Sequence, residues 1–271
     1  IGGEIMLNIG NQVVIIKGAG DLATGIAYRL WRAHFKILML EVEKPLVVRR
    51  TVSAAAAVFD QFARIEDLNV KLITDVDDFQ NDFDGVRIIV DEKGACINLL
   101  SPLILVDAIM AKRNTGTTKK MAPIVIGVGP GFNAPIDVDA VVETKRGHYL
   151  GRSIYSGSAI PNTGIPGIIG GYGIERLLRS PAKGYVRPLH KIGDMVEKGQ
   201  IIAFVGEDPV VSKIDGILRG LIHPSVLVVE GMKIGDIDPR CDIESCFTIS
   251  DKALSVGGGV LEAIAYKNKT I

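Results

Sequence analysis

Short apolar runs alternate with longer amphipathic stretches through the first half of the chain. The runs are rich in Val, Ile and Leu, and their alternation over residues 12–132 is typical of βα units around a parallel sheet. Uninterrupted runs such as Val13–Ile16 suit strands that are buried on both faces. The pattern predicts strands at Val13–Lys17, Ile37–Val42, Val86–Val90, Leu103–Asp107 and Ile124–Val128, and helices over Leu22–Ala33 and within Thr51–Phe62.

Glycine and proline dominate the middle of the chain. Six glycines and two prolines fall between Ser156 and Gly173. Such a density excludes a long helix or a central strand. We expect a long ordered loop there, because isoleucines recur within it, and long ordered loops in compact domains are often functional.

An internal repeat of 32 residues follows Lys183. A shift of that length superimposes six identical residues over the 19 positions that begin at Gly184, which falls on Gly216. Neither half can bury an apolar face alone, so the two are expected to close into one small sandwich. The pattern resembles the barrel-sandwich hybrid of lipoyl and biotinyl carrier domains, although the turn Glu207–Pro209 between the halves lacks the lysine that carriers modify.

The tail predicts a helix that packs back on the first half. Ser250 is a suitable N-cap, and Asp251 complements the dipole of a helix that runs to about Tyr266. Each glycine of Gly257–Gly259 would cost that helix about 1 kcal/mol, which indicates a close approach of its backbone to the sheet or to a ligand. The predicted fold class is α/β, a Rossmann-like parallel sheet domain followed by a small barrel-sandwich-hybrid module, with boundaries at 10–180, 181–240 and 241–271.

Composition narrows the range of partners and locations. The 271 residues include 31 Lys+Arg and 31 Asp+Glu, so the formal net charge is zero. Such a chain lacks the clustered positive charge on which binding to nucleic acid or to an anionic membrane depends, and we expect neither partner. No apolar run reaches the roughly 18–20 residues that cross a bilayer, and Ile1–Gly10 lacks a signal-peptide pattern. Three cysteines form no disulfide framework, so a reducing, cytoplasmic location is expected.

The motif GAGDLATG, which begins at Gly18, lies between the first predicted strand and the first predicted helix. Gly18, Gly20 and Ala23 match the G-x-G-x-x-A spacing of dinucleotide sites, in which glycine lets the backbone approach a pyrophosphate. Glu41 ends the second strand 21 residues after Gly20, where an acid binds ribose hydroxyls. Asp21 lies where phosphate would arrive and would repel it. We expect nucleotide-type binding here, and the alternative is a turn that needs glycine only for its geometry.

A second glycine-rich turn follows the last predicted strand. Ligands of open α/β sheets bind beyond the carboxyl ends of the strands, so Gly127, Gly129 and Gly131 are expected to face the same crevice as the first turn. Asn162 and Thr163 of the glycine-rich loop would add neutral hydrogen-bonding groups. An ordinary loop that leaves the sheet explains this turn equally well.

The remaining chemical signals are weak. Arg49 and Arg50 suit phosphate recognition, but a solvated surface pair explains them better. The four histidines are scattered, and Cys241 and Cys246 form a single C-x4-C pair, so no metal site is expected. No nucleophile–base pair and no P-loop can be identified, so the catalytic residues stay unknown.

Longer motifs resemble a known family. They are GAGDLATG, LEVEKPLVVRRTV (Leu40–Val52), VIGVGPGF (Val125–Phe132), VVETKRGHYLGRSIYSGSAIPNTGIPG (Val141–Gly167), KIGDIDPR (Lys233–Arg240) and CFTISDKALSVGGGVLEAI (Cys246–Ile264). These motifs are similar to the selenium-dependent molybdenum hydroxylase system protein family, which is distantly related to xanthine dehydrogenase maturation factors. The match covers nearly the whole chain and departs from the family pattern at Ala54–Ala57.

The resemblance implies an accessory or maturation protein, more in keeping with a non-enzymatic role than with an enzyme. Its partner would be a xanthine dehydrogenase-like molybdenum hydroxylase, and its ligand the molybdenum cofactor, a pterin dinucleotide, or the nucleotide part of it. Cys246, and less so Cys96 or Cys241, is a candidate sulfur- or selenium-handling thiol, although a buried structural cysteine is the commoner outcome. Two alternatives stay open: an NAD(P)-dependent oxidoreductase that uses the GAGDLATG turn, and a non-catalytic scaffold that docks the hydroxylase. A homo-oligomer also stays open.

Overall fold

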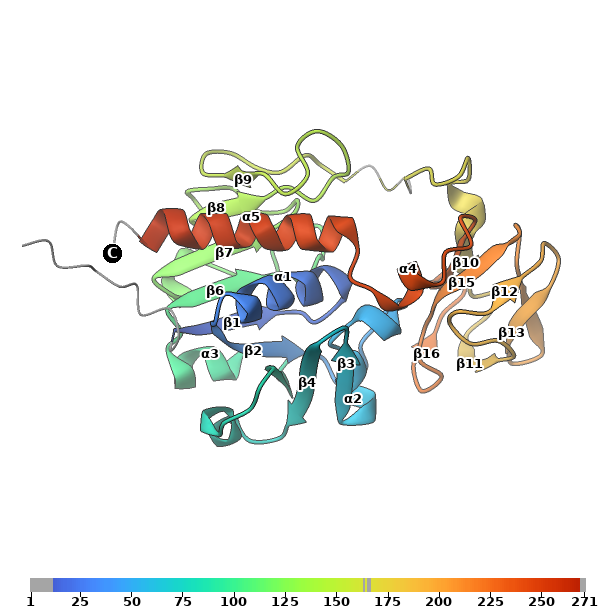
Figure 1. Ribbon diagram of the computed structural model, residues 1–271, viewed down its shortest axis with the longest axis horizontal. Helices are drawn as coiled ribbons and strands as arrows, with labels where there is room; N and C mark the ends of the chain where they lie inside the picture. Colours follow the sequence, from blue (N-terminus) through green and yellow to red (C-terminus); the bar gives the residue numbers. More distant parts are fainter. Residues whose placement is uncertain (1–11, 163, 165–166, 269–271) are drawn as a thin grey trace, which may run out of the picture.

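A computed structural model describes residues 12–162, 164 and 167–268 of the chain. Two lobes lie side by side along the longest axis (Figure 1). The large lobe is built on a nine-stranded sheet, and the small lobe on two four-stranded sheets. Among the described residues, no helix is both long enough and apolar enough to cross a membrane.

The sheet of the large lobe is mixed. Its strand order is β3-β4-β5-β2-β1-β6-β7-β8-β9. The inner strands of this order, β4-β5-β2-β1-β6-β7-β8, all run parallel. The edge strands β3 and β9 run antiparallel to their neighbours. In chain order the strands are β1 (Val13–Lys17), β2 (Lys36–Glu41), β3 (Phe62–Ile65), β4 (Leu68–Ile73), β5 (Val86–Val90), β6 (Ile104–Asp107), β7 (Ile124–Val128), β8 (Ala140–Val142) and β9 (Ser153–Ile154).

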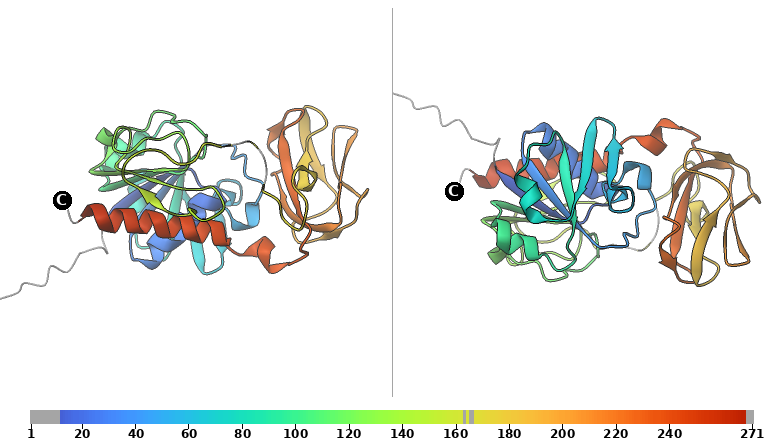
Figure 2. Two further views of the ribbon diagram at one scale, coloured as in Figure 1. Left: turned by 90° about the horizontal axis from the view of Figure 1, so that it is seen from above. Right: turned by 90° about the horizontal axis from the view of Figure 1, so that it is seen from below.

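Alternate strand residues fill separate cores on the two faces of this sheet. On one face, Val14 and Ile16 of β1 pack against α1 (Asp21–Arg32), α2 (Ala56–Asp60) and α5 (Asp251–Asn268). On the other face, Ile15 packs against shorter segments: η3 (Val76–Gln80), α3 (Ala95–Leu100) and η4 (Lys119–Met121). Figure 2 shows α5, the last helix of the chain, along the same side of the sheet as α1.

The small lobe repeats one arrangement of strands. β11 (Gly184–Pro188), β12 (Met195–Val196) and β13 (Ile201–Val205) begin 32 residues before β15 (Gly216–Leu221), β16 (Leu227–Val228) and β17 (Lys233–Asp238), respectively. β14 (Asp208–Val211) links the halves, and β10 (Leu177–Arg179) follows the short helix η5 (Ile174–Arg176). The two antiparallel sheets have the orders β10-β17-β15-β12 and β14-β13-β11-β16.

The lobes are joined through β15, which is buried along its whole length. The Leu221 N–H donates to the Val48 carbonyl, and the Arg50 guanidinium donates to the Leu221 carbonyl at 2.7 Å. Thr51, in η2 (Arg50–Val52), donates to a carbonyl of α4 (Glu244–Phe247). A segment of the large lobe, which contains Val48 and Arg50, and the α4 segment of the tail therefore pack together beside β15 of the small lobe.

These observations correct the predicted fold class. The five predicted strands are present, but the Rossmann-like parallel sheet is wrong, because β3 and β9 run antiparallel. The connecting helices that follow the 12-residue α1 are also short, since α2 has five residues and α3 has six. The carrier-like module is also wrong, because the small lobe shares the buried strand β15 with the segments that cover it. The proposed boundaries at 10–180, 181–240 and 241–271 stay a prediction.

Candidate functional site

A pocket of about 560 Å³, here called the sheet-edge pocket, lies at the carboxyl ends of the parallel strands of the large lobe. Strand order reverses between β1 and β6, since β1 leads to β2 on one side and β6 to β7 on the other. Ligands of open parallel sheets bind at such a reversal. Its lining includes Lys17, Gly18, Glu41, Asp91, Asn98 and Ile109.

Only one residue of the G-x-G-x-x-A motif lines this pocket. Gly18 has a φ of +91°, and a Cβ built there would stand 2.9 Å from the Ala108 carbonyl oxygen, so the site requires glycine. Gly20 is the N-cap of α1 and has an extended backbone. Ala23 is buried in the core against the sheet. The geometry of the turn therefore accounts for Gly18, and packing against the sheet accounts for Ala23.

Protein carboxylates already occupy the anion position of the turn between β1 and α1. Glu41 accepts hydrogen bonds from Ala19 N–H at 2.8 Å and from Val42 N–H at 2.9 Å. Asp21 accepts from Leu22 N–H at 2.9 Å and pairs with Arg49 at 3.2 Å. Two negative groups at the start of α1 repel phosphate. The residues present here do not fit the pyrophosphate of a pterin or nicotinamide dinucleotide.

A buried network supports the pocket from the β6 side. Lys17 Nζ lies 3.2 Å from Asp107 Oδ2 and 2.7 Å from Thr117 Oγ1. Thr117 donates to the same carboxylate oxygen at 2.5 Å. Lys17 and Asp107 end neighbouring strands, so the network fixes the relative position of both strand ends and of the Thr117 loop.

The second glycine-rich turn does not face the sheet-edge pocket. Gly127 packs against the Phe132 ring, Gly129 against Thr144, and Gly131 against the backbone of Arg113. These close contacts, and a φ of +78° at Gly129, explain the glycines by packing. The expectation that both turns share one crevice is not met, because the lining of the sheet-edge pocket contains no residue of this turn.

Asn162 instead lines a second pocket, here called the interlobe pocket, with a volume of about 500 Å³. The loop after β6 divides the two pockets, since Ile109 lines the first and Met110 the second. Met110 and Lys112 adopt left-handed φ angles of 62° and 63°, which strain non-glycine residues. Thr163, predicted beside Asn162, lies outside the described residues.

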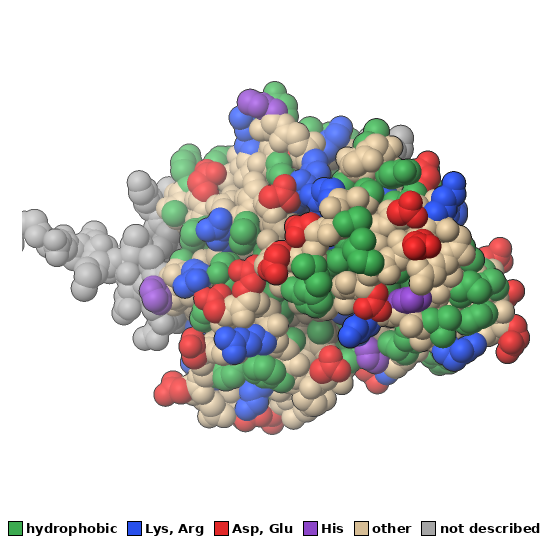
Figure 3. Space-filling view, turned by 45° about the vertical axis from the view of Figure 1, so that its right-hand side comes forward, with side chains coloured by type: hydrophobic (Ala, Val, Ile, Leu, Met, Phe, Trp, Pro, Cys, Tyr) green, Lys and Arg blue, Asp and Glu red, His purple; other side chains and the backbone are tan. Residues whose placement is uncertain are grey.

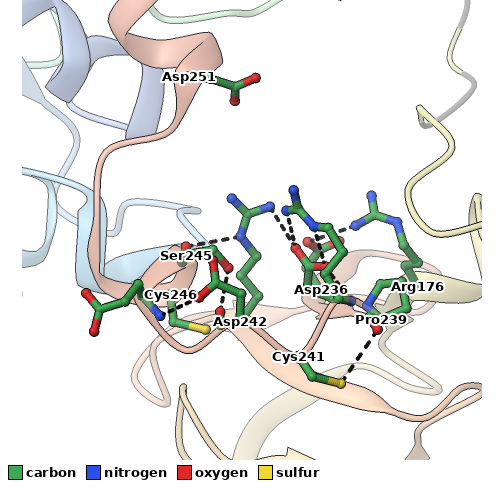
Figure 4. A network of polar contacts seen from close by, with 12 residues as sticks. Arg176, Asp236, Pro239, Cys241, Asp242, Ser245, Cys246 and Asp251 are labelled. Atoms are coloured by element: carbon green, nitrogen blue, oxygen red, sulfur yellow. Dashed lines mark hydrogen bonds and ion pairs between the residues drawn. The ribbon is translucent and has the colours of Figure 1, made fainter.

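Arg176 of the interlobe pocket lining belongs to a network of arginines and aspartates in the small lobe (Figure 4). Arg176 pairs with Asp236 at 3.5 Å, and Arg219 pairs with Asp238 at 3.3 Å. Arg240 forms a bidentate pair with Asp238, at 2.9 and 2.6 Å. Burial favours the neutral form of Asp238, but the hydrogen bonds from Arg240 and the charge of Arg219 outweigh it and hold the pKa below its ordinary value.

Sequence reasoning missed this cluster, although two signals were available. The repeat places Arg187 and Arg219 at equivalent positions, yet Arg187 stacks over Phe204 and only Arg219 is buried. Asp236 and Asp238 alternate with apolar residues in β17, and both are buried, which would have required buried partners. Elsewhere charges are mixed: on the face shown in Figure 3, acidic and basic side chains are interspersed.

The cysteines are separate, and two of the three are buried. Burial raises the pKa of the Cys246 thiol, and burial together with Asp91 raises the pKa of Cys96 to about 12. Cys241 is exposed. Within the described part of the chain, no three His, Cys, Asp or Glu side chains are arranged to hold a metal ion.

No family model matches the chain. The uncharacterized protein YqeB of Escherichia coli (strain K12) is 47% identical over 257 residues, which cover 94% of this chain and 48% of that protein. The chain thus spans about half the length of the curated relative it matches.

Two similar solved structures are named as aspartoacylase proteins, and a third as an ectoine utilization protein. The succinylglutamate desuccinylase/aspartoacylase of Rhodobacter sphaeroides is 20% identical, with a TM-score of 0.21 over 23% of this chain and 22% of that chain. An aspartoacylase family protein of Mesorhizobium loti is 11% identical, with a TM-score of 0.27 over 84% of both chains. The ectoine utilization protein EutE (DoeB) of Ruegeria pomeroyi is 12% identical, with a TM-score of 0.24 over 84% and 85%. TM-scores this low support no argument about what this chain does.

These comparisons correct the predicted family and function. None of the relatives named above is a molybdenum hydroxylase accessory protein, and the predicted membership, the maturation role and the selenium dependence are wrong. The predicted hydroxylase partner is wrong for the same reason. The two alternatives, an NAD(P)-dependent oxidoreductase and a scaffold for the hydroxylase, gain no support from these names either. The thiol-handling role of Cys246 belonged to the same function, and its burial argues against it.

Proposed function

We propose that this protein binds a small, hydroxyl-bearing molecule in the sheet-edge pocket. The observation that carries the proposal is the position of Glu41, a half-buried carboxylate at the end of β2, on the wall of a pocket at the reversal of strand order. The volume of about 560 Å³ is in the usual range for small-ligand sites.

The lining groups suit hydroxyls better than phosphates. Glu41 and Asp91 each accept two backbone N–H bonds, and an ionised carboxylate keeps further lone pairs that accept hydrogen bonds from a ligand. Lys17 and Asn98 line the same pocket and add donors to it. Adjacent donors and acceptors match a hydroxyl, which both gives and receives a hydrogen bond. Three carboxylates, from Glu41, Asp91 and Glu92, outnumber the two lysines of the lining, Lys17 and Lys93, and this excess of negative charge disfavours a phosphate ligand.

The chain offers a matched pair of variants for the test. Asn98 lines the pocket from α3, and its neighbour Leu99 is 69% exposed and does not line it. Asn98→Trp should fill the pocket and abolish ligand binding, and Leu99→Trp should leave binding unchanged. The ligands tested are a sugar, a linear polyol and a nucleoside, with inorganic pyrophosphate for comparison, by thermal shift and then by calorimetry.

The expected result is stabilisation by a member of the hydroxylated group, with loss of at least about tenfold in affinity in Glu41→Gln, because hydrogen bonds to a charged group contribute about 1.5–3 kcal/mol. Binding of pyrophosphate alone would contradict the proposal, as would equal binding by the two tryptophan variants. The cytoplasm stays the proposed location, supported by the three free cysteines.

A further inference from the structure

The interlobe pocket gathers cationic side chains from distant parts of the chain. Arg146 follows β8, Arg176 belongs to η5, and Lys252 lies in the first turn of α5. Lys112 and Lys145 also line the pocket. Acidic side chains are absent from the lining that the structure describes.

Arg176 is the most constrained of these cations. Its residue is 6% exposed, and within the described chain its Nε and Nη1 atoms have no hydrogen-bond acceptor. The ion pair to Asp236, at 3.5 Å, is too long to be a good hydrogen bond. A buried guanidinium with unpaired N–H groups is costly, and an oxyanion in the pocket beside it would compensate its charge.

Lys252 offers a second unpartnered cation in the same pocket. Its side chain is half-buried, and no described residue accepts a hydrogen bond from its ammonium group or forms an ion pair with it. Burial lowers its pKa, since removal from water disfavours the charged amine. An anion placed beside Lys252 would stabilise the charged form.

The acidic groups around the pocket are already engaged. Asp251 accepts a bidentate pair from Arg146, at 2.7 and 2.8 Å. The buried Glu143 carboxylate accepts from the backbone N–H groups of Thr144, Lys145 and Ile160. Figure 4 shows Asp251 on α5, across from the side chains of Arg176 and Asp236. Neither carboxylate forms an ion pair with Arg176 or Lys252 among the residues described.

We propose that the interlobe pocket is a binding site for the oxyanion of a small metabolite, a carboxylate or a phosphate group held between Arg176 and Lys252. The remaining volume, beside Ile160 and Ile169, takes the rest of the molecule. This site is separate from the sheet-edge pocket and does not depend on the hydroxyl-bearing ligand proposed above.

The test is calorimetric titration of the whole chain with malonate and, separately, with inorganic phosphate. Saturable binding of one or both, with a Kd below about 1 mM, is expected. The malonate arm identifies a carboxylate site and the phosphate arm a phosphate site. Failure of both probes to saturate at about 10 mM would overturn the proposal.

Variants then locate the site. Lys252→Met removes an unpartnered cation, so it should fold normally and weaken binding at least about tenfold. Arg176→Lys keeps a positive charge beside Asp236, so that this buried carboxylate retains a partner, but it loses the planar fork and should also weaken binding. Lys198→Met, on the exposed surface of the small lobe, is the matched control and should bind as the unmodified chain does.

Two results separate this site from the sheet-edge pocket. Asn98→Trp should leave malonate and phosphate binding unchanged, and Lys252→Met should leave binding of the hydroxylated ligand unchanged. Unaltered anion binding in both Lys252→Met and Arg176→Lys would overturn the assignment to the interlobe pocket.

Discussion

Gly257 of α5 lies directly against the Gly25 carbonyl of α1: a Cβ built at Gly257 would stand 2.5 Å from that oxygen. The approach is reciprocal, because a Cβ at Gly25 would stand 2.6 Å from Ala253. Helix packing therefore explains Gly257, and a close contact with the Gly151 backbone explains Gly259. Helices that approach so closely leave no space for a methyl group at the crossing.

We expect Gly257→Ala to destabilise the protein by about 1–3 kcal/mol, because overpacking at the crossing forces the helices apart. Gly258→Ala is the control one residue away. Nothing lies within 4 Å of a Cβ at Gly258, so this change should stabilise by up to about 1 kcal/mol through helix propensity. Urea unfolding of the three proteins measures both values, and equal effects of the two changes would contradict the crossing.

Hydrophobic periodicity predicted the interior of the large sheet well and its edges poorly. The five predicted strands are buried and apolar, so their signal is strong. The edge strand β3 alternates exposed and covered residues over only four positions, and β9 has two residues. These short, half-exposed segments resemble loops in sequence, and they are what makes the sheet mixed.

Residues of the candidate sites could be predicted from the sequence only where they lie close together along the chain. Gly18 and Glu41 follow consecutive strands, and both were expected at the carboxyl edge, where they lie. The interlobe pocket joins Arg146, Arg176 and Lys252, which are separated by up to about a hundred residues and brought together by the return of α5. No spacing rule connects such residues before the fold is known.

Asp238 of the small lobe is fully buried and forms ion pairs with both Arg219 and Arg240. Asp238→Asn should destabilise by about 3–5 kcal/mol, since it leaves the buried Arg219 without its partner. Asp208→Asn, at an exposed position of β14, is the control and should stay within about 0.5 kcal/mol. Guanidinium unfolding at neutral pH measures both.

The Asp238 carboxylate also predicts that the stability of the protein depends on pH. The pKa of Asp238 is below its ordinary value in the folded protein, so its contribution is present above the unfolded pKa of about 3.9 and is lost as pH falls through the folded value. The difference in unfolding free energy between the unmodified chain and Asp238→Asn should therefore shrink below about pH 4. A constant difference down to acid unfolding would contradict this assignment.

Glu41 predicts a pH dependence of stability with the opposite sign. Burial raises its pKa in the folded protein, although the N–H groups of Val42 and Ala19 act in the other direction. Its favourable contribution is therefore present below the unfolded pKa and is lost as pH rises through the folded value. The glutamine of Glu41→Gln does not titrate. The free energy of unfolding of this variant should therefore rise relative to that of the unmodified chain as the pH increases from about 4 to 7. Glu207→Gln, at an exposed turn, should run parallel to the unmodified chain.

Lys252 is surrounded by charges of both signs. Burial is the main reason that its pKa is lowered, and Arg146 acts in the same direction. Asp21, Glu143 and Asp251 act in the opposite direction. Arg176 lines the same pocket. Because its pKa is lowered, Lys252 loses its proton below the ordinary range of a lysine.

The affinity of the interlobe pocket for malonate should therefore fall as pH rises toward the lysine range, and should begin to fall below the ordinary lysine pKa of about 10.4. The reason is that the unpartnered Lys252 ammonium loses its proton while the charge of the malonate stays constant. Lys252→Met should bind more weakly at pH 7 and lose most of the pH dependence, whereas Lys252→Arg should retain affinity into the alkaline range. Calorimetric titrations between about pH 7 and 10 provide the measurement. If the affinities of the unmodified chain and of Lys252→Met declined in parallel, a group other than Lys252 would be responsible for the pH dependence, and the assignment of Lys252 to the bound anion would be wrong.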